Sequence, residues 1–120
     1  MTGIFSADFY DTKNGIITGG DYEKQEQNWQ NKAITTNGGK SWKLVGENQG
    51  CGYTSCVKFV PKSKGKKIIA VGGTGMFYSI DKGKNWIKFS EEKHFFAIQF
   101  ESDKVFYATG KNKLVRYVIK

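Results

Sequence analysis

An eight-residue pattern that occurs twice constrains the fold of this chain more than any other feature of its sequence. Residues Thr35–Trp42 (TTNGGKSW) and Ser79–Trp86 (SIDKGKNW) both read [S/T]-x-[D/N]-x-G-x-x-W, and the second begins 44 positions after the first. An apolar run ending in two glycines precedes each copy, IITGG at 16–20 and IAVGG at 69–73, and a similar run, YATG, stands at 107–110. Repetition at a fixed spacing of this length is the signature of a repeat architecture.

Short strands joined by tight turns account for each repeat. Apolar and polar residues alternate at 5–10, 56–60 and 95–101, as in half-buried strands. The turns at 37–39 and 81–83 use Asn, Asp and Gly, which reach positive φ at little cost. A four-stranded meander that recurs about every 40 residues is typical of a propeller blade.

We therefore expect an all-β fold of about eleven antiparallel strands, a partial β-propeller. It would contain two full four-stranded blades, at 1–47 and 48–90, and an incomplete three-stranded blade at 91–120 whose last strand is Leu114–Ile119. The place of a fourth strand in that last blade would stay vacant. Since at least about four blades are needed to close a ring, we expect an open arc that recruits missing blades or self-associates.

The two octapeptides resemble Asp-box (BNR) repeats, which occur in sialidase-like propellers, sortilin-type receptors and photosystem II stability/assembly factors. The whole chain is similar to the C-terminal part of bacterial BNR-repeat propellers of the last group. The likeness is carried by GIFS at 3–6, GIITGGDY at 15–22 and GYTSCV at 52–57. The resemblance implies a propeller fold and a module cut from a larger protein, but it does not specify an activity.

In those families the Asp box is structural, and the residue types agree with that role. A side-chain acceptor can cap backbone N–H groups in the turn, while the tryptophan covers neighbouring core. Asn37 departs from the usual aspartate but still supplies an acceptor. The residues to which we assign this structural role are Thr35, Asn37, Gly39, Trp42, Ser79, Asp81, Gly83 and Trp86.

The connections of a meander alternate between its two ends, which separates the Asp-box turns from a candidate binding face. From Gly19 to Asn37 there are 18 positions but from Gly72 to Asp81 only nine, so the first repeat has nine extra residues at about 22–30. They belong to the end opposite the Asp boxes, as does the link 46–54 between repeats. Insertions commonly decorate the binding face of repeat proteins. The candidate ligand- or partner-binding residues are Asp21, Tyr22, Trp29 and Tyr53; the alternative is that Trp29 folds back onto its blade.

The net charge of +8 invites a nucleic-acid interpretation, which the details disfavour. Arg116 is the only arginine, and arginine is the residue suited to bidentate contacts with phosphate and guanine. The densest basic stretch, 62–67, has Ser and Gly interleaved, as a solvated turn would. We expect no nucleic-acid partner and no membrane insertion, because no apolar run approaches the ~18 residues of a membrane span.

Cys51 and Cys56 are the only cysteines, and with a lone His94 they make no metal site. A local disulfide would require the segment between them to curl, and we favour two separate thiols with Cys56 buried in a strand. The first ten residues lack the basic and apolar regions of a signal peptide, so none is expected, whereas the parent protein of such a module could be exported.

The function that we expect is a non-catalytic binding or scaffold module, with a protein or carbohydrate ligand and no cofactor. The first alternative is the remnant of a sialidase-like glycoside hydrolase. That family relies on an arginine cluster, which a chain with one arginine cannot form. The second alternative is a purely structural fragment without an activity of its own. No nucleophile elbow, phosphate-binding loop or cluster of metal ligands is visible in the sequence.

Overall fold

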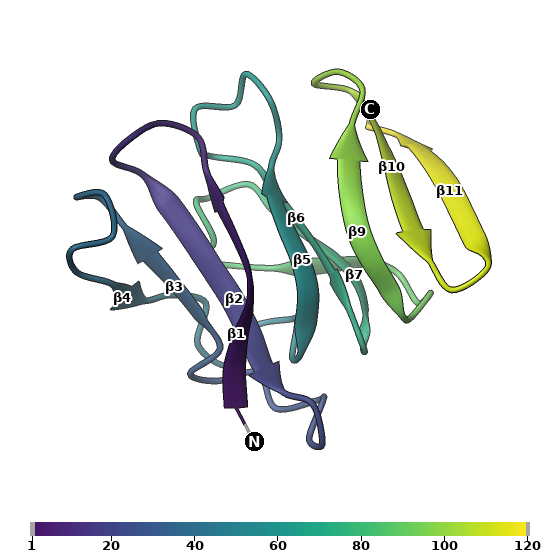
Figure 1. The fold of residues 1–120 in the computed structure, drawn as a ribbon, viewed down its shortest axis with the longest axis horizontal. Helices are drawn as coiled ribbons and strands as arrows, with labels where there is room; N and C mark the ends of the chain where they lie inside the picture. The colour runs from purple at the N-terminus through teal and green to yellow at the C-terminus, as the bar shows by residue number, and fades with distance from the viewer. Residues whose placement is uncertain (1, 120) are drawn as a thin grey trace.

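The computed structural model describes residues 2–119, and this part of the chain contains strands and turns but no helix (Figure 1). The expected number of eleven strands is confirmed. They are β1 (Thr2–Phe9), β2 (Gly15–Asp21), β3 (Lys32–Thr35), β4 (Lys43–Leu44), β5 (Thr54–Phe59), β6 (Ile68–Gly72), β7 (Gly75–Ser79), β8 (Ile87–Ser90), β9 (Phe95–Phe100), β10 (Val105–Gly110) and β11 (Lys113–Val118).

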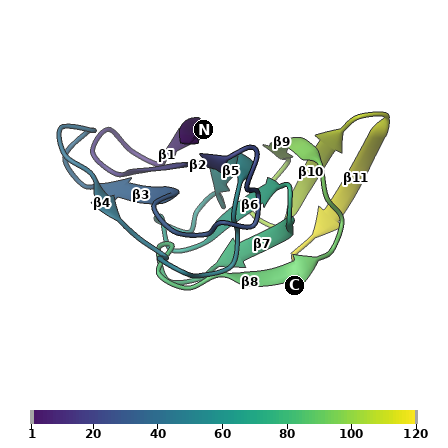
Figure 2. The ribbon, with the colours of Figure 1, turned by 90° about the horizontal axis from the view of Figure 1, so that it is seen from below.

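Three antiparallel meanders divide the strands, in the orders β1-β2-β3-β4, β5-β6-β7-β8 and β9-β10-β11. The three sheets lie side by side and diverge from one another, and the first strand of each is at the side where the sheets are closest (Figures 1 and 2). Side chains of β1 join it to β5, because Ser6 Oγ and Asp8 Oδ2 accept hydrogen bonds from the backbone N–H groups of Val57 and Phe59, at 3.0 and 2.8 Å.

The middle sheet is buried on both faces, which explains why its strands are more continuously apolar than the others. Ile68 and Ala70 of β6 pack toward the first sheet, in a core cluster with Ile16 and Trp86. The alternate residues of β6 pack toward the third sheet, in a second cluster that also contains aromatic residues of β9 and β10. Each core is therefore an interface between two sheets, as expected for stacked blades.

The outer sheets each bury one face only. β11 shows this as strict alternation of exposed and half-buried residues. On the free flank of the first sheet, Ile4, Phe9 and Leu44 are exposed apolar residues. The free face of the third sheet is mixed. Gln99 pairs with Tyr107 and Tyr107 with Arg116 across the sheet, and the exposed apolar residues Leu114 and Val118 flank Arg116 on β11.

The two Asp-box turns fold alike. Gly39 and Gly83 have φ of 92° and 91°, which confirms that these positions disfavour a side chain. Their backbone N–H groups donate to Thr35 Oγ1 and Ser79 Oγ at 2.9 and 2.8 Å. The same hydroxyl groups donate hydrogen bonds to Oδ1 of the central residue, at 2.9 Å for Asn37 and 2.8 Å for Asp81.

The substitution of Asn37 for the usual aspartate is compensated four residues later. Asp81 Oδ2 accepts a hydrogen bond from Asn85 Nδ2 at 2.7 Å. In the first turn the direction is reversed, since Asn37 Nδ2 donates to Ser41 Oγ at 2.8 Å. In the second turn the central residue accepts and the residue four positions later donates, whereas in the first turn these roles are exchanged. Both turns therefore satisfy their polar atoms.

Cys51 and Cys56 are free, buried thiols, as favoured from the sequence. Cys51 belongs to the core between the first two sheets and Cys56, in β5, to the core between the last two. They therefore lie on opposite faces of the middle sheet. Within residues 2–119 there is no helix long and apolar enough to cross a membrane.

Candidate ligand-binding site

The two ends of the sheets carry the connections that the meander predicts. At one end the β1–β2 turn lies against the first Asp-box turn, with Gly38 N–H donating to the Lys13 carbonyl at 2.9 Å. At the other end the inserted loop 22–31 lies against the link 45–53. Tyr53 N–H donates to the Gln25 carbonyl at 2.8 Å, and Gln30 N–H to Glu47 Oε1 at 2.6 Å. The insertion is thus fastened to the link along its length.

Three aromatic rings form a row at this end. The ring centroids of Phe5 and Tyr53 are 5.0 Å apart and those of Tyr53 and Tyr22 are 5.5 Å apart, both in edge-to-face geometry. Partial burial, and to a lesser degree the neighbouring Tyr22, raise the pKa of the Tyr53 phenol. Tyr22 remains 64% exposed, so its ring presents a free surface next to an ordered one.

A cavity of about 400 Å³ opens beside this row, between the second and third sheets. Its aromatic wall consists of Tyr22 and Tyr53 on one side and Phe96 on the other. Basic side chains come from the third sheet and from the link before it. The complete lining is Tyr22, Gln25, Tyr53, Ser55, Gly72, Gly73, His94, Phe95, Phe96, Lys111 and Lys113, which contains no carboxylate.

The basic residues are held in different ways. Lys113 Nζ donates to the Lys93 carbonyl at 2.6 Å and lies 4.3 Å from the centroid of the Phe95 ring. A lysine ammonium has three donors, so this contact leaves others for a ligand. Lys111 is exposed in the β10–β11 turn. His94 has a positive φ of 65°, and its backbone N–H donates to the Gly72 carbonyl at 3.1 Å, which fixes the link 91–94 against β6.

Glycine at position 52 allows the inserted loop to approach the second sheet beside the cavity. A Cβ on Gly52 would overlap the backbone carbonyl oxygen of Gln25, so a larger residue there would displace the loop. A Cβ on Gly73, which lines the cavity, would overlap Gln25 Oε1, so the flexible Gln25 side chain would have to move.

The four candidate residues do not form one site. Tyr22 and Tyr53 line the cavity together. Asp21 is buried at the end of β2, where its Oδ1 accepts the Glu23 N–H at 2.9 Å in a turn. Trp29 is 46% exposed and borders a separate, open depression formed by its own loop, residues 23–27.

Several lining residues are absent from the sequence-based candidates, namely Gln25, His94, Phe96, Lys111 and Lys113. The alternation of meander connections could have found most of them. The link 91–94 and the β10–β11 turn emerge at the same end as the insertion, by the rule that placed Tyr53 there. What the sequence could not show is that the third sheet packs close enough for these side chains to face Tyr22.

The described residues contain no group of three or more His, Cys, Asp or Glu side chains that could hold a metal ion. Two acidic side chains near this end have local partners. Asp21 and Glu47 accept backbone N–H groups of the inserted loop. The chemistry offered by the cavity is therefore that of aromatic faces with cationic hydrogen-bond donors.

Among known proteins, the similarity is one of fold. No protein-family model and no curated protein matches the chain. The crystal structure of an ancestral GH74 enzyme superimposes with a TM-score of 0.66 at 16% identity, over 97% of this chain and 18% of that one. A structure of YCF48 bound to D1 peptide gives a TM-score of 0.48 at 14% identity, over 99% of this chain and 54% of that one.

The superposition on the GH74 enzyme agrees with the three meander sheets, and the predicted all-β, partial β-propeller fold is confirmed. The chain spans less than a fifth of the GH74 enzyme and about half of YCF48.

Proposed function

We propose that this chain is a non-catalytic β-propeller module that binds a carboxylate-bearing ligand at the end opposite its Asp-box turns. The observation that carries the proposal is the cavity of about 400 Å³ whose wall combines Tyr22 and Tyr53 with Lys111 and Lys113, and contains no acidic side chain. Aromatic faces supply apolar contact area at a low cost in side-chain entropy, and ammonium groups select for negative charge.

The free energies of the available hydrogen bonds and ion pairs favour a short acidic ligand. A hydrogen bond to a charged group contributes about 1.5–3 kcal/mol when it is shielded from water, but an exposed pair contributes about 0–1 kcal/mol. Lys113 is the better-positioned donor, because its contact with the Phe95 ring and the Lys93 carbonyl restricts its side chain. The aromatic row must supply much of the remaining affinity, and we expect it to be in the micromolar range or weaker.

The arrangement of charges supports a binding role rather than hydrolysis. Glycoside hydrolysis generally requires two carboxyl groups that converge on the substrate, about 5–10 Å apart. The lining of the cavity holds none, and Arg116 lies on the free face of the third sheet, away from it. A chain with this lining can orient an acidic ligand but has no evident general acid.

We also infer that the module works within a larger assembly of blades. The free flank of the first sheet exposes Ile4, Phe9, Trp42 and Leu44, which pack against no other sheet in residues 2–119. A monomeric protein seldom leaves so many neighbouring large apolar side chains in water. This supports the view of the chain as part of a longer propeller, and the resemblance noted in the sequence suggests the C-terminal part.

Titration by two-dimensional NMR tests the ligand class. Digalacturonate and an acidic tetrapeptide serve as probes, with the methyl ester of the first and the amide form of the second as neutral counterparts. We expect the acidic probes to shift the resonances of Tyr53, His94 and Lys113. The double variant Lys111→Gln/Lys113→Gln should weaken binding at least tenfold, whereas Lys62→Gln/Lys64→Gln, at the opposite end, should not.

Two results would contradict the proposal. Equal binding of acidic and neutral probes would show that the lysines do not select the ligand. Perturbations confined to the Asp-box turns would place any binding face at the other end of the sheets. Preference for one of the two acidic probes distinguishes a carbohydrate from a peptide ligand.

A further inference from the structure

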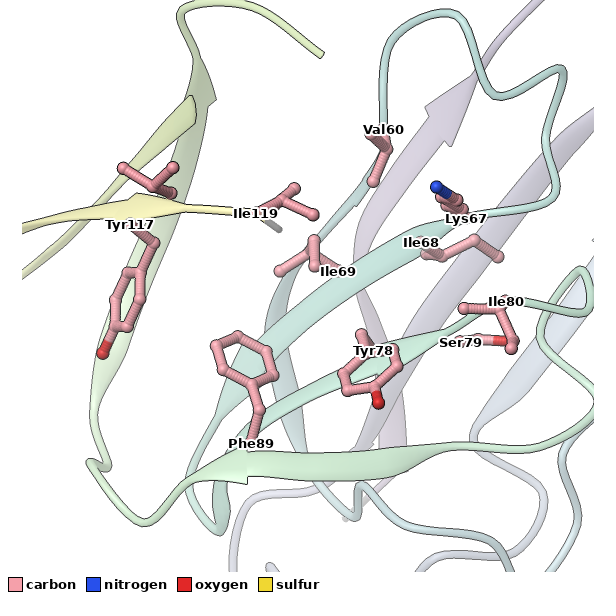
Figure 3. Close-up of a pocket in the computed structure, with 11 residues that line it drawn as sticks. Val60, Lys67, Ile68, Ile69, Tyr78, Ser79, Ile80, Phe89, Tyr117 and Ile119 are labelled. Atoms are coloured by element: carbon pink, nitrogen blue, oxygen red, sulfur yellow. The ribbon is translucent and has the colours of Figure 1, made fainter. Parts of the chain in front are cut away.

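Lysine side chains gather in three turns at the Asp-box end of the first two sheets. Two of these turns, β1–β2 and β5–β6, lie at the top of Figure 1, and the third is the second Asp-box turn. Lys67, at the end of the β5–β6 turn, lines a cavity of about 350 Å³ between the second and third sheets and so belongs to a different surface (Figure 3). The other six lysines, which we call the basic patch, are all exposed: Lys13, Lys62, Lys64, Lys66, Lys82 and Lys84.

Contacts between the turns make the basic patch one continuous surface. The backbone N–H of Lys82 donates to the Lys66 carbonyl at 3.1 Å, which joins the second Asp-box turn to the β5–β6 turn. A Cβ on Gly65 would overlap the ring of Tyr10, so the β1–β2 turn lies directly against the β5–β6 turn. The ring centroids of Tyr10 and Phe59 are 4.9 Å apart in edge-to-face geometry. The six ammonium groups are therefore carried by turns that pack on one another.

Most of the net charge of the chain lies in these three turns. Residues 10–14, 60–67 and 80–86 contain seven lysines and two aspartates, and so hold five of the eight net positive charges. At the opposite end of the sheets, the inserted loop, the links 45–53 and 91–94 and the β10–β11 turn together contain five glutamates and three lysines. The molecule is therefore positive at its Asp-box end and not uniformly basic.

Carboxylates do not neutralise the basic patch. Asp11 and Asp81 each accept backbone N–H groups of their own turns, at 2.7 and 2.9 Å, and so serve to hold those turns. Within residues 2–119 no lysine of the patch forms an ion pair with a carboxylate, whereas Lys88 and Glu91, outside the patch, form one at 2.8 Å. The ammonium groups of the patch are thus available to a partner.

Three lysines of the patch stand where the backbone disfavours them. Lys62, Lys64 and Lys82 have φ of 67°, 55° and 64°, in the left-handed region that glycine and asparagine adopt more readily. The first Asp-box turn has Gly38 at the place of Lys82. A charge that only kept the chain soluble could stand at any exposed position. Its presence at three unfavourable positions indicates a function of these ammonium groups.

We propose that the basic patch binds the surface of a bilayer that contains anionic lipid, without inserting into it. The Asp-box end then faces the lipid headgroups, and the ligand cavity at the opposite end faces solution. Each lysine close to such a surface strengthens the attachment about fivefold. Because the Debye length is about 10 Å at 0.1 M salt, lysines must share one face of the molecule to contribute together, as these six do.

The residue type favours lipid over nucleic acid. The patch consists of lysine alone, whereas Arg116, the only arginine, lies on β11 in the third sheet. A lysine ammonium is a hydrated point charge on a flexible stem, while the guanidinium of arginine is suited to bidentate contact with a fixed phosphate. Anionic lipids diffuse within a bilayer and can gather beneath flexible lysines, whereas the phosphates of a duplex have a fixed spacing.

Sedimentation with vesicles measures the partition of the 120-residue chain onto lipid. The vesicles contain phosphatidylcholine alone or a 2:1 mixture of phosphatidylcholine and phosphatidylglycerol. We expect binding to the anionic vesicles only, and weaker binding when NaCl is raised from about 0.05 M to about 0.5 M. Lys62→Gln/Lys64→Gln should weaken the partition at least tenfold. Lys24→Gln/Lys93→Gln, which removes the same charge from the opposite end, should weaken it less than twofold.

A third variant separates binding from stability. Lys82→Gly removes one charge from the patch and a left-handed lysine from the turn, so it should weaken the partition about fivefold without lowering the unfolding temperature. Equal binding to neutral and anionic vesicles would overturn the proposal, as would equal losses in the two double variants, which would show that only the net charge matters. Tighter binding to duplex DNA or to polyglutamate, at equal charge concentration and ionic strength, would assign the patch to a soluble polyanion and equally overturn it.

Discussion

Trp42 and Trp86 make the same hydrogen bond in two equivalent turns, and their exposed fractions differ by a factor of about seven. Each indole N–H donates to the carbonyl three residues earlier, Gly39 at 3.1 Å and Gly83 at 2.8 Å. Trp42 is nevertheless 37% exposed and Trp86 only 5%. The hydrogen bond is set within the turn, whereas burial is supplied by the neighbouring sheet, which the second turn has and the first lacks.

This pair predicts unequal effects of one substitution. Trp86→Ala should lower the free energy of unfolding by about 3–5 kcal/mol, because it opens a cavity between two sheets. Trp42→Ala should cost less than half as much, since its ring mainly contacts Phe9, at a centroid distance of 6.1 Å. Urea denaturation of the two variants measures both values. Equal losses would mean that the flank of the first sheet is covered in solution.

Substitution of glycine for either of two lysines in the second Asp-box turn should change the stability in opposite directions. Lys82 has a φ of 64°, and the first turn has Gly38 at that place, with φ of 75°. Lys82→Gly should therefore raise the stability by up to about 1 kcal/mol, because it removes left-handed strain. Lys84→Gly, in the same turn but without a positive φ, should lower it by about 0.5–1 kcal/mol. Thermal unfolding compares the two, and a loss of stability on Lys82→Gly would show that this strain is negligible.

The second turn should also lose stability in acid. Burial alone would raise the pKa of Asp81, but the hydrogen bonds donated by Asn85 and Ser79 outweigh it and lower the pKa below its usual value. A carboxyl group with a lowered pKa stabilises the fold above its unfolded pKa, near 3.8, and this contribution is lost as the pH falls through the lower folded value. Because the group is half-exposed, we expect less than about 1 kcal/mol.

Denaturation between pH 5 and pH 2 measures this contribution, which Asp81→Asn should abolish. The converse double variant Asn37→Asp/Ser41→Asn copies the second turn into the first and should add a similar acid-sensitive step. An unchanged pH profile in both variants would show that neither turn stabilises a carboxylate.

An opposite dependence is expected at alkaline pH. Complete burial raises the pKa of the Cys51 thiol from 9.0 to about 11. The folded state then holds its proton more tightly than the unfolded state, so the stabilisation is full below pH 9 and is lost as the pH rises toward 11. The loss amounts to about 2–3 kcal/mol at most. Burial lowers the pKa of the neighbouring Lys32, which acts with the opposite sign as the pH approaches 10.5.

Cys51→Ala should therefore make the decline of stability above pH 9 shallower, measured by urea denaturation between pH 7 and pH 10.5. Cys56→Ala is the comparison, because burial also raises the pKa of this second thiol, which lies in the other core. We expect the larger change in Cys51→Ala, since its thiol is the more completely buried; a larger change in Cys56→Ala would assign the decline mainly to the second thiol.

The sequence predicted the features that are local and failed on those that depend on neighbouring sheets. The number of strands follows from alternation and was confirmed, and the residues that favour turns at 37–39 and 81–83 do lie in turns, with positive φ at Gly39 and Gly83. The burial of Lys32, whose Nζ donates to Asn31 Oδ1 and to the carbonyls of Gln49 and Cys51, could not be predicted, because all three acceptors depend on how the inserted loop and the link fold. The residues next to a lysine in an apolar strand do not indicate that such acceptors will surround its ammonium group.

The candidate site shows the same division. The rule of alternating connections placed Tyr22 and Tyr53 at one end, and they line one cavity. Trp29 is only seven residues from Tyr22 and yet borders a different depression, because hydrogen bonds at Gln25 and Gln30 fix the path of the loop between them. Composition alone could not distinguish these two aromatic residues.

The two free faces of the molecule carry different side chains, which separates two kinds of assembly. The first face exposes Ile4 and Leu44, whereas on the last face Leu114 and Val118 flank Arg116, and the Tyr107 hydroxyl donates to Glu101 Oε1 at 2.9 Å. A contact between the first face of one copy and the last face of another is heterologous and has no two-fold axis. Such head-to-tail stacking ends in either a closed ring or an open filament, according to the rotation between successive blades, whereas a two-fold axis would pair like faces and stop at two copies.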